Sequence, residues 1–128
     1  MGLAGVDADR AARRTALLAA LGNPQRGLAV VQVAGTNGKG STAALLAEIL
    51  RAAGLRTGRF TSPDLAGPHE RFWLDGATMT PAELARREVA LAPTFAAVEA
   101  RWPQLGPLGA FERWCAIAWG WLAEQGAQ

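Results

Sequence analysis

The chain has 128 residues, of which 50% are hydrophobic and 19% are charged, as expected for one globular domain. Its formal net charge of +2 comes from a small surplus of arginines spread along the sequence, which argues against a nucleic-acid surface. One cysteine, Cys115, excludes an internal disulfide, and with the single histidine, His69, it leaves too few ligands for a zinc site.

The sequence contains no segment typical of membrane insertion or export. The most apolar stretch, residues 111–123, is too short to cross a bilayer, and the first residues lack the apolar core of a signal peptide. A reducing cytosol also suits a chain without a disulfide. We therefore predict a cytoplasmic protein whose partners are small molecules rather than membranes or nucleic acid.

The first half of the chain predicts a helix, a strand, a glycine-rich turn and a second helix. Residues 8–21 place leucines at helical spacing and end at the sequence GNP. Residues 28–34 are apolar, rich in valine and bounded by glycines, which is typical of a buried parallel strand. Residues 39–53 repeat apolar positions with helical period, and Gly54 follows where a C-terminal cap belongs.

Further strands and a final helix are predicted in the second half. Residues 55–61 predict a strand, residues 62–70 a proline- and glycine-containing loop, and residues 71–76 a short strand that ends in a turn. Residues 110–124 are apolar on almost every side. Such a helix needs burial on more than one side.

The helix between them has clear start signals. Thr80 is placed as the N-cap, Pro81 at the first helical position, and Glu83 where a capping box would close. This helix is predicted to run toward Trp102, with Pro93 kinking or splitting it.

The turn GTNGKGST at residues 35–42 carries the strongest functional signal. It contains Lys39, the one lysine beside twelve arginines, and a compact ammonium suits a crowded phosphate site. A loop between a strand and a helix start presents backbone N–H groups and the positive end of the helix dipole to an anion.

The residue types in this turn fit a polyphosphate. Its three glycines permit close approach, Lys39 can reach the phosphates, and Ser41 and Thr42 supply hydroxyls. The pattern departs from a strict G-x-x-x-x-G-K-[ST] loop, because Val33 occupies the first glycine position and Gly40 separates Lys39 from Ser41. It predicts nucleotide binding, and a purely structural glycine turn is the alternative.

Several motifs together resemble the folylpolyglutamate synthase and dihydrofolate synthase family, which is related to the Mur ligases. They are LGNPQ, VAGTNGKGST, TSPDL, HERFWLDG and the FE of LGAFERW, in this order across most of residues 16–124. The form GKGS is the more specific element, since Mur ligases usually place Thr or Ser directly after the lysine.

The resemblance implies a fold and a reaction. The fold would be α/β and P-loop-containing, a mostly parallel doubly wound sheet with flanking helices, as in the central ATPase domain of Mur ligases. Residues 1–128 would be the N-terminal part of this domain, which is incomplete here. The reaction would use ATP and Mg²⁺ to activate a carboxylate of folate or dihydropteroate as an acyl phosphate, which the amine of L-glutamate then attacks.

The resemblance also implies site residues. The ATP phosphates would lie on the loop formed by Thr36, Asn37, Gly38, Lys39, Gly40, Ser41 and Thr42. Ser62 would ligate magnesium, which prefers hard oxygen ligands; a serine that caps a proline turn is the alternative. The pterin would contact Gly109, Ala110, Phe111 and Glu112; the alternative is a core phenylalanine followed by a glutamate that the helix dipole favours.

Departures from the family pattern shape these expectations. Asp64 stands where family members usually have a histidine, and the sequence stops before the family's next magnesium-binding segment and its C-terminal glutamate-binding domain. We therefore expect a fragment that is inactive alone and that self-associates, although family members are usually monomeric. The alternatives are a Mur-type peptide ligase or other P-loop enzyme, and a non-catalytic nucleotide-binding remnant.

The remaining conspicuous residues have structural interpretations. His69 is expected at the surface or anchoring its loop, and Cys115 is expected to pack in an apolar helix rather than act as a nucleophile. The pair Arg86 and Arg87 predicts a solvated helix face, and the five tryptophans predict core or domain contacts.

Overall fold

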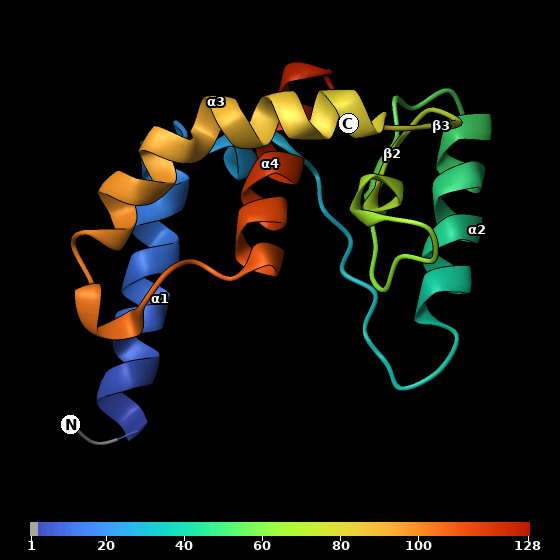
Figure 1. Cartoon of the computed structure of the whole chain (residues 1–128). Helices are drawn as coiled ribbons and strands as arrows, with labels where there is room; N and C mark the ends of the chain where they lie inside the picture. The colour runs from blue at the N-terminus through green and yellow to red at the C-terminus, as the bar shows by residue number, and fades with distance from the viewer. Residues whose placement is uncertain (1–2) are drawn as a thin grey trace.

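The computed structural model describes residues 3–128 and shows helices around a small sheet (Figure 1). The helices are α1 (Leu3–Ala20), α2 (Lys39–Ala52), α3 (Pro81–Glu99) and α4 (Ala110–Glu124), with 3₁₀ turns η1 (Pro24–Gly27), η2 (Pro68–Arg71) and η3 (Pro103–Leu105). The strands are β1 (Gly58–Phe60), β2 (Phe72–Leu74) and β3 (Ala77–Thr78). In Figure 1, α3 crosses the molecule from the sheet, which lies beside α2, to α1 at the other end.

The sheet is antiparallel, with the strand order β1-β2-β3. In its register, Trp73 of β2 lies opposite Arg59 of β1 on one side and Thr78 of β3 on the other. Asp75 and Gly76 join β2 to β3 with φ angles of 47° and 99°, the left-handed backbone that tight two-residue hairpins require. The predicted strands at 55–61 and 71–76 are confirmed, and β3 is an additional strand.

The buried parallel strand predicted at residues 28–34 is wrong. This segment runs as an extended connection without strand pairing, and Val30 and Val31 are 57% and 67% exposed. A parallel strand needs neighbours that supply hydrogen bonds, and no backbone group of residues 29–34 has a backbone partner among residues 3–128. The sheet is therefore antiparallel and three-stranded rather than mostly parallel and doubly wound, although the α/β class is confirmed.

The four predicted helices are confirmed, with two corrections in α3. Thr80 caps this helix by accepting a hydrogen bond from the Glu83 N–H at 3.1 Å, but the Glu83 carboxylate accepts from Arg86 and Arg87 instead of closing a capping box. Of the two predicted effects of Pro93, the split is wrong, because Pro93 lies inside a continuous helix, whereas the kink stays a prediction. The carbonyl that loses its donor belongs to Val89, an exposed position where water can take its place.

The solvated helix face predicted for Arg86 and Arg87 is confirmed for Arg86 and wrong for Arg87. Arg86 is exposed, whereas the Arg87 side chain is 15% exposed and bridges Glu83 of its own helix to Glu124 of α4. One arginine of the pair therefore ties two helices together.

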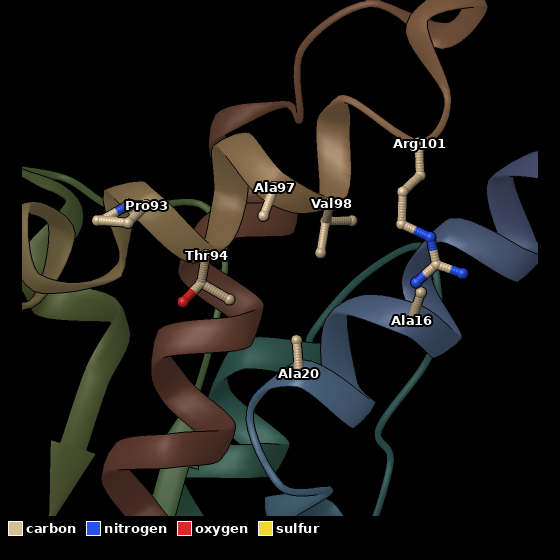
Figure 2. A pocket seen from close by; sticks show the side chains of 7 residues that line it. All are labelled: Ala16, Ala20, Pro93, Thr94, Ala97, Val98 and Arg101. Carbon is tan, nitrogen blue, oxygen red and sulfur yellow. The ribbon is translucent and has the colours of Figure 1, made fainter.

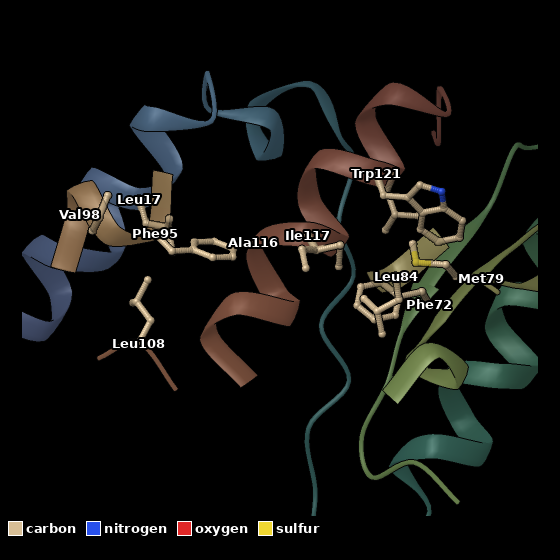
Figure 3. Close-up of a cluster of buried hydrophobic side chains, with 12 residues drawn as sticks. Leu17, Phe72, Met79, Leu84, Phe95, Val98, Leu108, Ala116, Ile117 and Trp121 are labelled. Carbon is tan, nitrogen blue, oxygen red and sulfur yellow. The ribbon is translucent and has the colours of Figure 1, made fainter. Parts of the chain in front are cut away.

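The core lies where α4 meets the sheet, α1 and α3 (Figure 3). Phe72 and Ile117 are its most deeply buried large side chains, and the Phe72 ring packs edge-on against Phe60 and Trp121 with centroid distances of 5.2 and 6.2 Å. Buried residues of α4 are Ala116, Ile117, Ala118, Trp121 and Leu122. The prediction that α4 is buried on more than one side is thus confirmed.

Two further properties concern the apolar residues of the helices and of the surface. Within residues 3–128, no helix combines the length and the hydrophobicity that a membrane span requires. Large apolar side chains are nevertheless exposed on α2, just after it and in the extended connection before it: Leu45, Ile49, Leu55, Val30 and Val31.

We predict that Ile49→Lys, combined with Leu45→Lys, lowers self-association of the chain. Both side chains are more than 60% exposed on α2, and exposed apolar groups of this kind promote association. The fraction of oligomer, measured by sedimentation velocity, should fall. Ala52→Lys adds a charge at an exposed position of the same helix without removing a large apolar side chain and should leave association almost unchanged. Monodisperse wild-type monomers with a cooperative melt would contradict the expectation.

We also predict that Gly58→Ala destabilises the fold by about 1–3 kcal/mol through overpacking. A Cβ atom at this position of β1 would lie 2.2 Å from a methyl carbon of Leu122, which is buried in the core. Urea unfolding should show the loss. In a Leu122→Ala background the cost of Gly58→Ala should largely disappear, and a cost that stays the same in both backgrounds would rule out this contact as its cause.

Candidate functional site

The loop before α2 is an exposed turn with glycine at the N-cap of the helix. Gly38, the N-cap, has φ 74° and ψ 1°, so a left-handed backbone rather than a lack of space calls for glycine there. Its carbonyl accepts the first intrahelical bond, from the Thr42 N–H at 2.9 Å. The amides of the preceding residues in this first turn lack intrahelical acceptors, and residues 34–42 are all exposed.

Lys39 folds back over this loop. Its Nζ atom donates to the Gly35 carbonyl oxygen at 3.3 Å, and the side chain forms no ion pair with a carboxylate among residues 3–128. The polar side chains around it also make no hydrogen bonds within the described part of the chain: Thr36, Asn37, Ser41 and Thr42. The loop therefore offers hydroxyls and backbone donors that the fold leaves uncommitted, beside a cation whose acceptor is a neutral carbonyl.

The loop that contains Ser62 is held by a carboxylate. Glu70 accepts hydrogen bonds from the Leu65 and Ala66 N–H groups at 3.0 and 2.9 Å, and these bonds lower the pKa of the Glu70 carboxyl. Ser62 precedes Pro63 through a cis peptide bond and is partly buried. Its hydroxyl has no hydrogen-bond partner among residues 3–128, so it does not cap the turn.

Glu112 has a structural role at the start of α4. Its Oε2 atom accepts from the Gly109 N–H at 3.0 Å and from Nη2 of Arg13 at 3.2 Å. Arg13 comes from α1, is 4% exposed, and also donates through Nη1 to the Gly106 carbonyl at 2.8 Å. In the chain without a ligand, Glu112 thus has the helix-start role that was given above as the alternative to pterin contact.

Phe111 differs from the core phenylalanine considered from the sequence. It is 52% exposed, and its ring centroid lies 5.9 Å from that of Phe60. The guanidinium of Arg71 lies 6.0 Å from the same ring and 4.8 Å from the ring of Trp114. An exposed aromatic face is thus present at the start of α4, where the resemblance places the pterin.

The structure brings some of the predicted site residues together and leaves others apart. Arg71 pairs with Asp64, so the loop after β1 is joined to Phe111 and Trp114 at the start of α4. Among the described residues, the loop before α2 and the aromatic face are not linked by any hydrogen bond or ion pair, and the same holds for the loop before α2 and the loop after β1.

Sequence reasoning missed the two arginines that organise this region. Arg13 lies four residues before the buried Leu17 on α1, and this spacing is the signal that could have placed it on the buried face. Arg71 belongs to the HERFWLDG motif, but no pattern indicated that it would contact Asp64.

A hollow elsewhere on the molecule has little chemistry. It measures about 400 Å³, is open to solvent, and lies between α1 and α3 (Figure 2). Its lining consists of Ala16, Ala20, Pro93, Thr94, Ala97, Val98 and Arg101, so it includes none of the predicted site residues. Within residues 3–128, no three His, Cys, Asp or Glu side chains gather into a group that could bind a metal ion.

We predict that Cys115 reacts slowly with alkylating reagents in the folded protein. Burial raises the pKa of its thiol to about 11, so about one thiol in a thousand is ionised at pH 8. Labelling with iodoacetamide, followed by mass spectrometry, should be on the order of 100-fold slower in buffer than in denaturant, where the pKa returns to about 8.5. Equal rates in the two conditions would contradict a packed, unreactive thiol.

We predict that Arg13→Met lowers the free energy of unfolding by about 1–3 kcal/mol. The change leaves the Gly106 carbonyl and one bond of the Glu112 carboxylate without their donor. Arg14→Met is the matched control, because it removes the same charge from an exposed neighbouring position of α1. Urea unfolding measures the free energy of unfolding of both variants. Equal decreases would mean that the bonds of Arg13 to Gly106 and Glu112 do not stabilise the fold.

Comparison with known proteins gives consistent results for sequence and fold. No protein-family model matches the chain. It is 39% identical over 87 residues to the dihydrofolate synthase/folylpolyglutamate synthase of Mycobacterium tuberculosis, covering 68% of this chain and 18% of that protein. It is 49% identical over 59 residues to the folylpolyglutamate synthase of Lacticaseibacillus casei, covering 46% of this chain and 14% of that protein.

The solved structures that resemble the chain carry the same names. The folylpolyglutamate synthase of M. tuberculosis complexed with ADP superimposes with a TM-score of 0.87 and 33% identity, covering 93% of this chain and 27% of that one. The folylpolyglutamate synthetase from Lactobacillus casei superimposes with a TM-score of 0.80 and 31% identity, covering 90% of this chain and 29% of that one. The chain thus spans less than a fifth of these curated relatives and less than a third of these solved structures.

Proposed function

Since this chain belongs, in sequence and fold, with part of the folylpolyglutamate and dihydrofolate synthases, we propose that it carries the nucleotide-phosphate part of such a ligase. Residues 1–128 are then the N-terminal part of an ATP-binding domain of the Mur-ligase central type. The reaction we propose is the addition of L-glutamate to folate or dihydropteroate. ATP activates the carboxylate as an acyl phosphate, and the glutamate amine then displaces phosphate to form the amide.

The observation that supports this proposal best is the start of α2. Lys39 lies over a glycine-flanked helix start whose hydroxyls and amides are uncommitted, in a chain similar to a structure solved with ADP. Amide donors and a single ammonium suit the β- and γ-phosphates of ATP. We assign Thr36, Asn37, Gly38, Lys39, Gly40, Ser41 and Thr42 to this role.

The Ser62 hydroxyl fits a magnesium ion that accompanies the nucleotide. It is a hard oxygen ligand without another partner among the described residues, and magnesium typically takes one or two protein oxygens together with water and phosphate. When bound, the ion would neutralise phosphate charge. The chain's own contribution is to hold the Ser62 loop in place through the bonds of Glu70 to Leu65 and Ala66.

We assign the aromatic face at the start of α4 to the pterin. Phe111 offers a half-exposed ring for stacking, with Gly109 and Ala110 beside it at the helix start. Glu112 uses Oε2 for Gly109 and Arg13, so its Oε1 atom is the acceptor that can reach the N–H groups of a ligand. The same carboxylate would thus serve both the cap and the pterin.

We predict that Lys39→Ala weakens binding of ADP or AMPPCP at least tenfold. The substitution removes the one ammonium from the loop and leaves its glycine geometry in place, so the loss comes from phosphate attraction. Isothermal titration calorimetry measures it directly. Arg51→Ala is the matched control, because it removes one positive charge at the other end of α2 and should change the affinity little. Equal losses in both variants would indicate a general charge effect instead of a site at Lys39.

Substrate tests separate the ligase from the alternatives. With ATP and glutamate present, formation of a glutamyl product from folate or dihydropteroate supports the proposal, whereas turnover of a muramyl substrate favours a Mur-type peptide ligase. Nucleotide binding that depends on Lys39, without any turnover, favours a non-catalytic nucleotide-binding module. We expect this chain alone to bind without turnover, because phosphoryl transfer requires more charge neutralisation than the 35–42 loop and the Ser62 hydroxyl provide.

A further inference from the structure

Arg71 is placed between a carboxylate and two aromatic rings. Its Nε atom donates to Oδ1 of Asp64 at 2.6 Å, and a second guanidinium nitrogen pairs with the same oxygen. The guanidinium carbon lies 4.8 Å from the Trp114 ring centroid and 6.0 Å from that of Phe111. The Arg71 side chain is only 13% exposed and that of Asp64 only 23%, so this ion pair is largely shielded from water.

Because the ion pair is shielded from water, the position of the Arg71 side chain depends on Asp64. A guanidinium packed beside rings has lost much of its water and needs acceptors for its edge N–H groups. Asp64 is the one carboxylate that pairs with Arg71 within residues 3–128. If the aspartate were neutral, the arginine would gain by turning toward solvent, and it would leave the rings.

The Phe111 ring lies beside the Arg71 guanidinium and is otherwise largely open to solvent. The ring is half exposed, and the aromatic group beside it is Phe60, tilted by 41°. An exposed phenylalanine with one ring neighbour can turn about its side-chain bonds unless another group restricts it. The Arg71 guanidinium lies close enough to the Phe111 ring to restrict this rotation.

We propose that Arg71, held by Asp64, is a positioning residue that fixes the Phe111 ring for stacking on a flat heterocycle. The inference rests on the pterin assignment made above and adds two residues to it. The ion pair has no net charge, so it does not attract a charged ligand. Its effect on binding comes from the orientation of the Phe111 ring. Its effect should therefore be the same for a neutral pterin and for pteroate, which carries a carboxylate.

The test compares Asp64→Asn with Asp64→Glu. The first removes the charge at almost constant shape, and the second restores the charge. Selective labelling of the four phenylalanines, with Phe111→Leu to assign the resonance, reports the Phe111 ring by NMR. Titrations with pterin and with pteroate, followed by tryptophan fluorescence, report binding. Arg71→Lys serves as a second variant, because it keeps the charge and loses the planar fork.

The expected result has three parts. Asp64→Asn and Arg71→Lys shift and broaden the Phe111 ring resonance, and Asp64→Glu restores it. Both ligands bind roughly three- to tenfold more weakly to the first two variants, in line with the measured range for aromatic and cation–π contacts. The thermal midpoint falls in Asp64→Asn and Arg71→Lys, because each leaves a largely shielded group without its full set of partners, so the titrations are made at a temperature where both variants are folded.

Other outcomes overturn the inference in distinguishable ways. An unchanged Phe111 resonance in Asp64→Asn means that the pair does not hold the ring. A changed resonance with unchanged affinities, while Phe111→Ala abolishes binding, removes the positioning role and leaves the pterin assignment intact. Weaker binding of pteroate alone assigns Arg71 to direct contact with the carboxylate. Failure of the wild-type chain to bind either ligand overturns the pterin assignment together with this inference, whereas the Lys39 test of nucleotide binding stands apart.

Discussion

The burial of α4 is the interaction on which the described structure depends. Ile117 and Trp121 pack against Phe72 of the sheet on one side, while α1 and α3 cover the remaining apolar positions. A helix with apolar residues on nearly every side cannot be stable in water alone, so the elements that surround it are drawn together by the same free-energy gain. The close approach of β1 at Gly58 and the ion pairs of Arg13 and Arg87 with α4 all follow from this packing.

The helices and turns could be predicted because their signals are local. Thr80 and Pro81 mark the start of α3, and Gly54 ends α2 in the left-handed backbone that a helix C-terminus favours. The same local signals singled out residues 35–42, since a glycine-rich turn before a helix is visible in the sequence alone. Its assignment to ATP stays a prediction.

Long-range pairing could not be predicted in this way. Residues 28–34 have the composition of a buried strand, yet composition states only that burial is favourable and does not supply a neighbouring strand. Likewise, nothing local distinguishes Arg71, which meets Asp64 across a loop, from an exposed arginine such as Arg86. The aromatic face at Phe111 was anticipated through family resemblance, but the arginine beside it required the structure.

The bond between Lys39 and the Gly35 carbonyl means that any anion bound by the 35–42 loop would have to replace an existing acceptor of the ammonium. The ammonium already has an acceptor, so an incoming phosphate replaces a neutral oxygen by a charged one instead of capturing an idle cation. At 3.3 Å the existing bond is long and is easily given up. Only the difference between the two acceptors contributes to the part of the affinity that comes from Lys39, and it grows with the charge of the incoming group. The loop would therefore rank anions by charge, favouring a polyphosphate over a simple carboxylate before any other residue takes part.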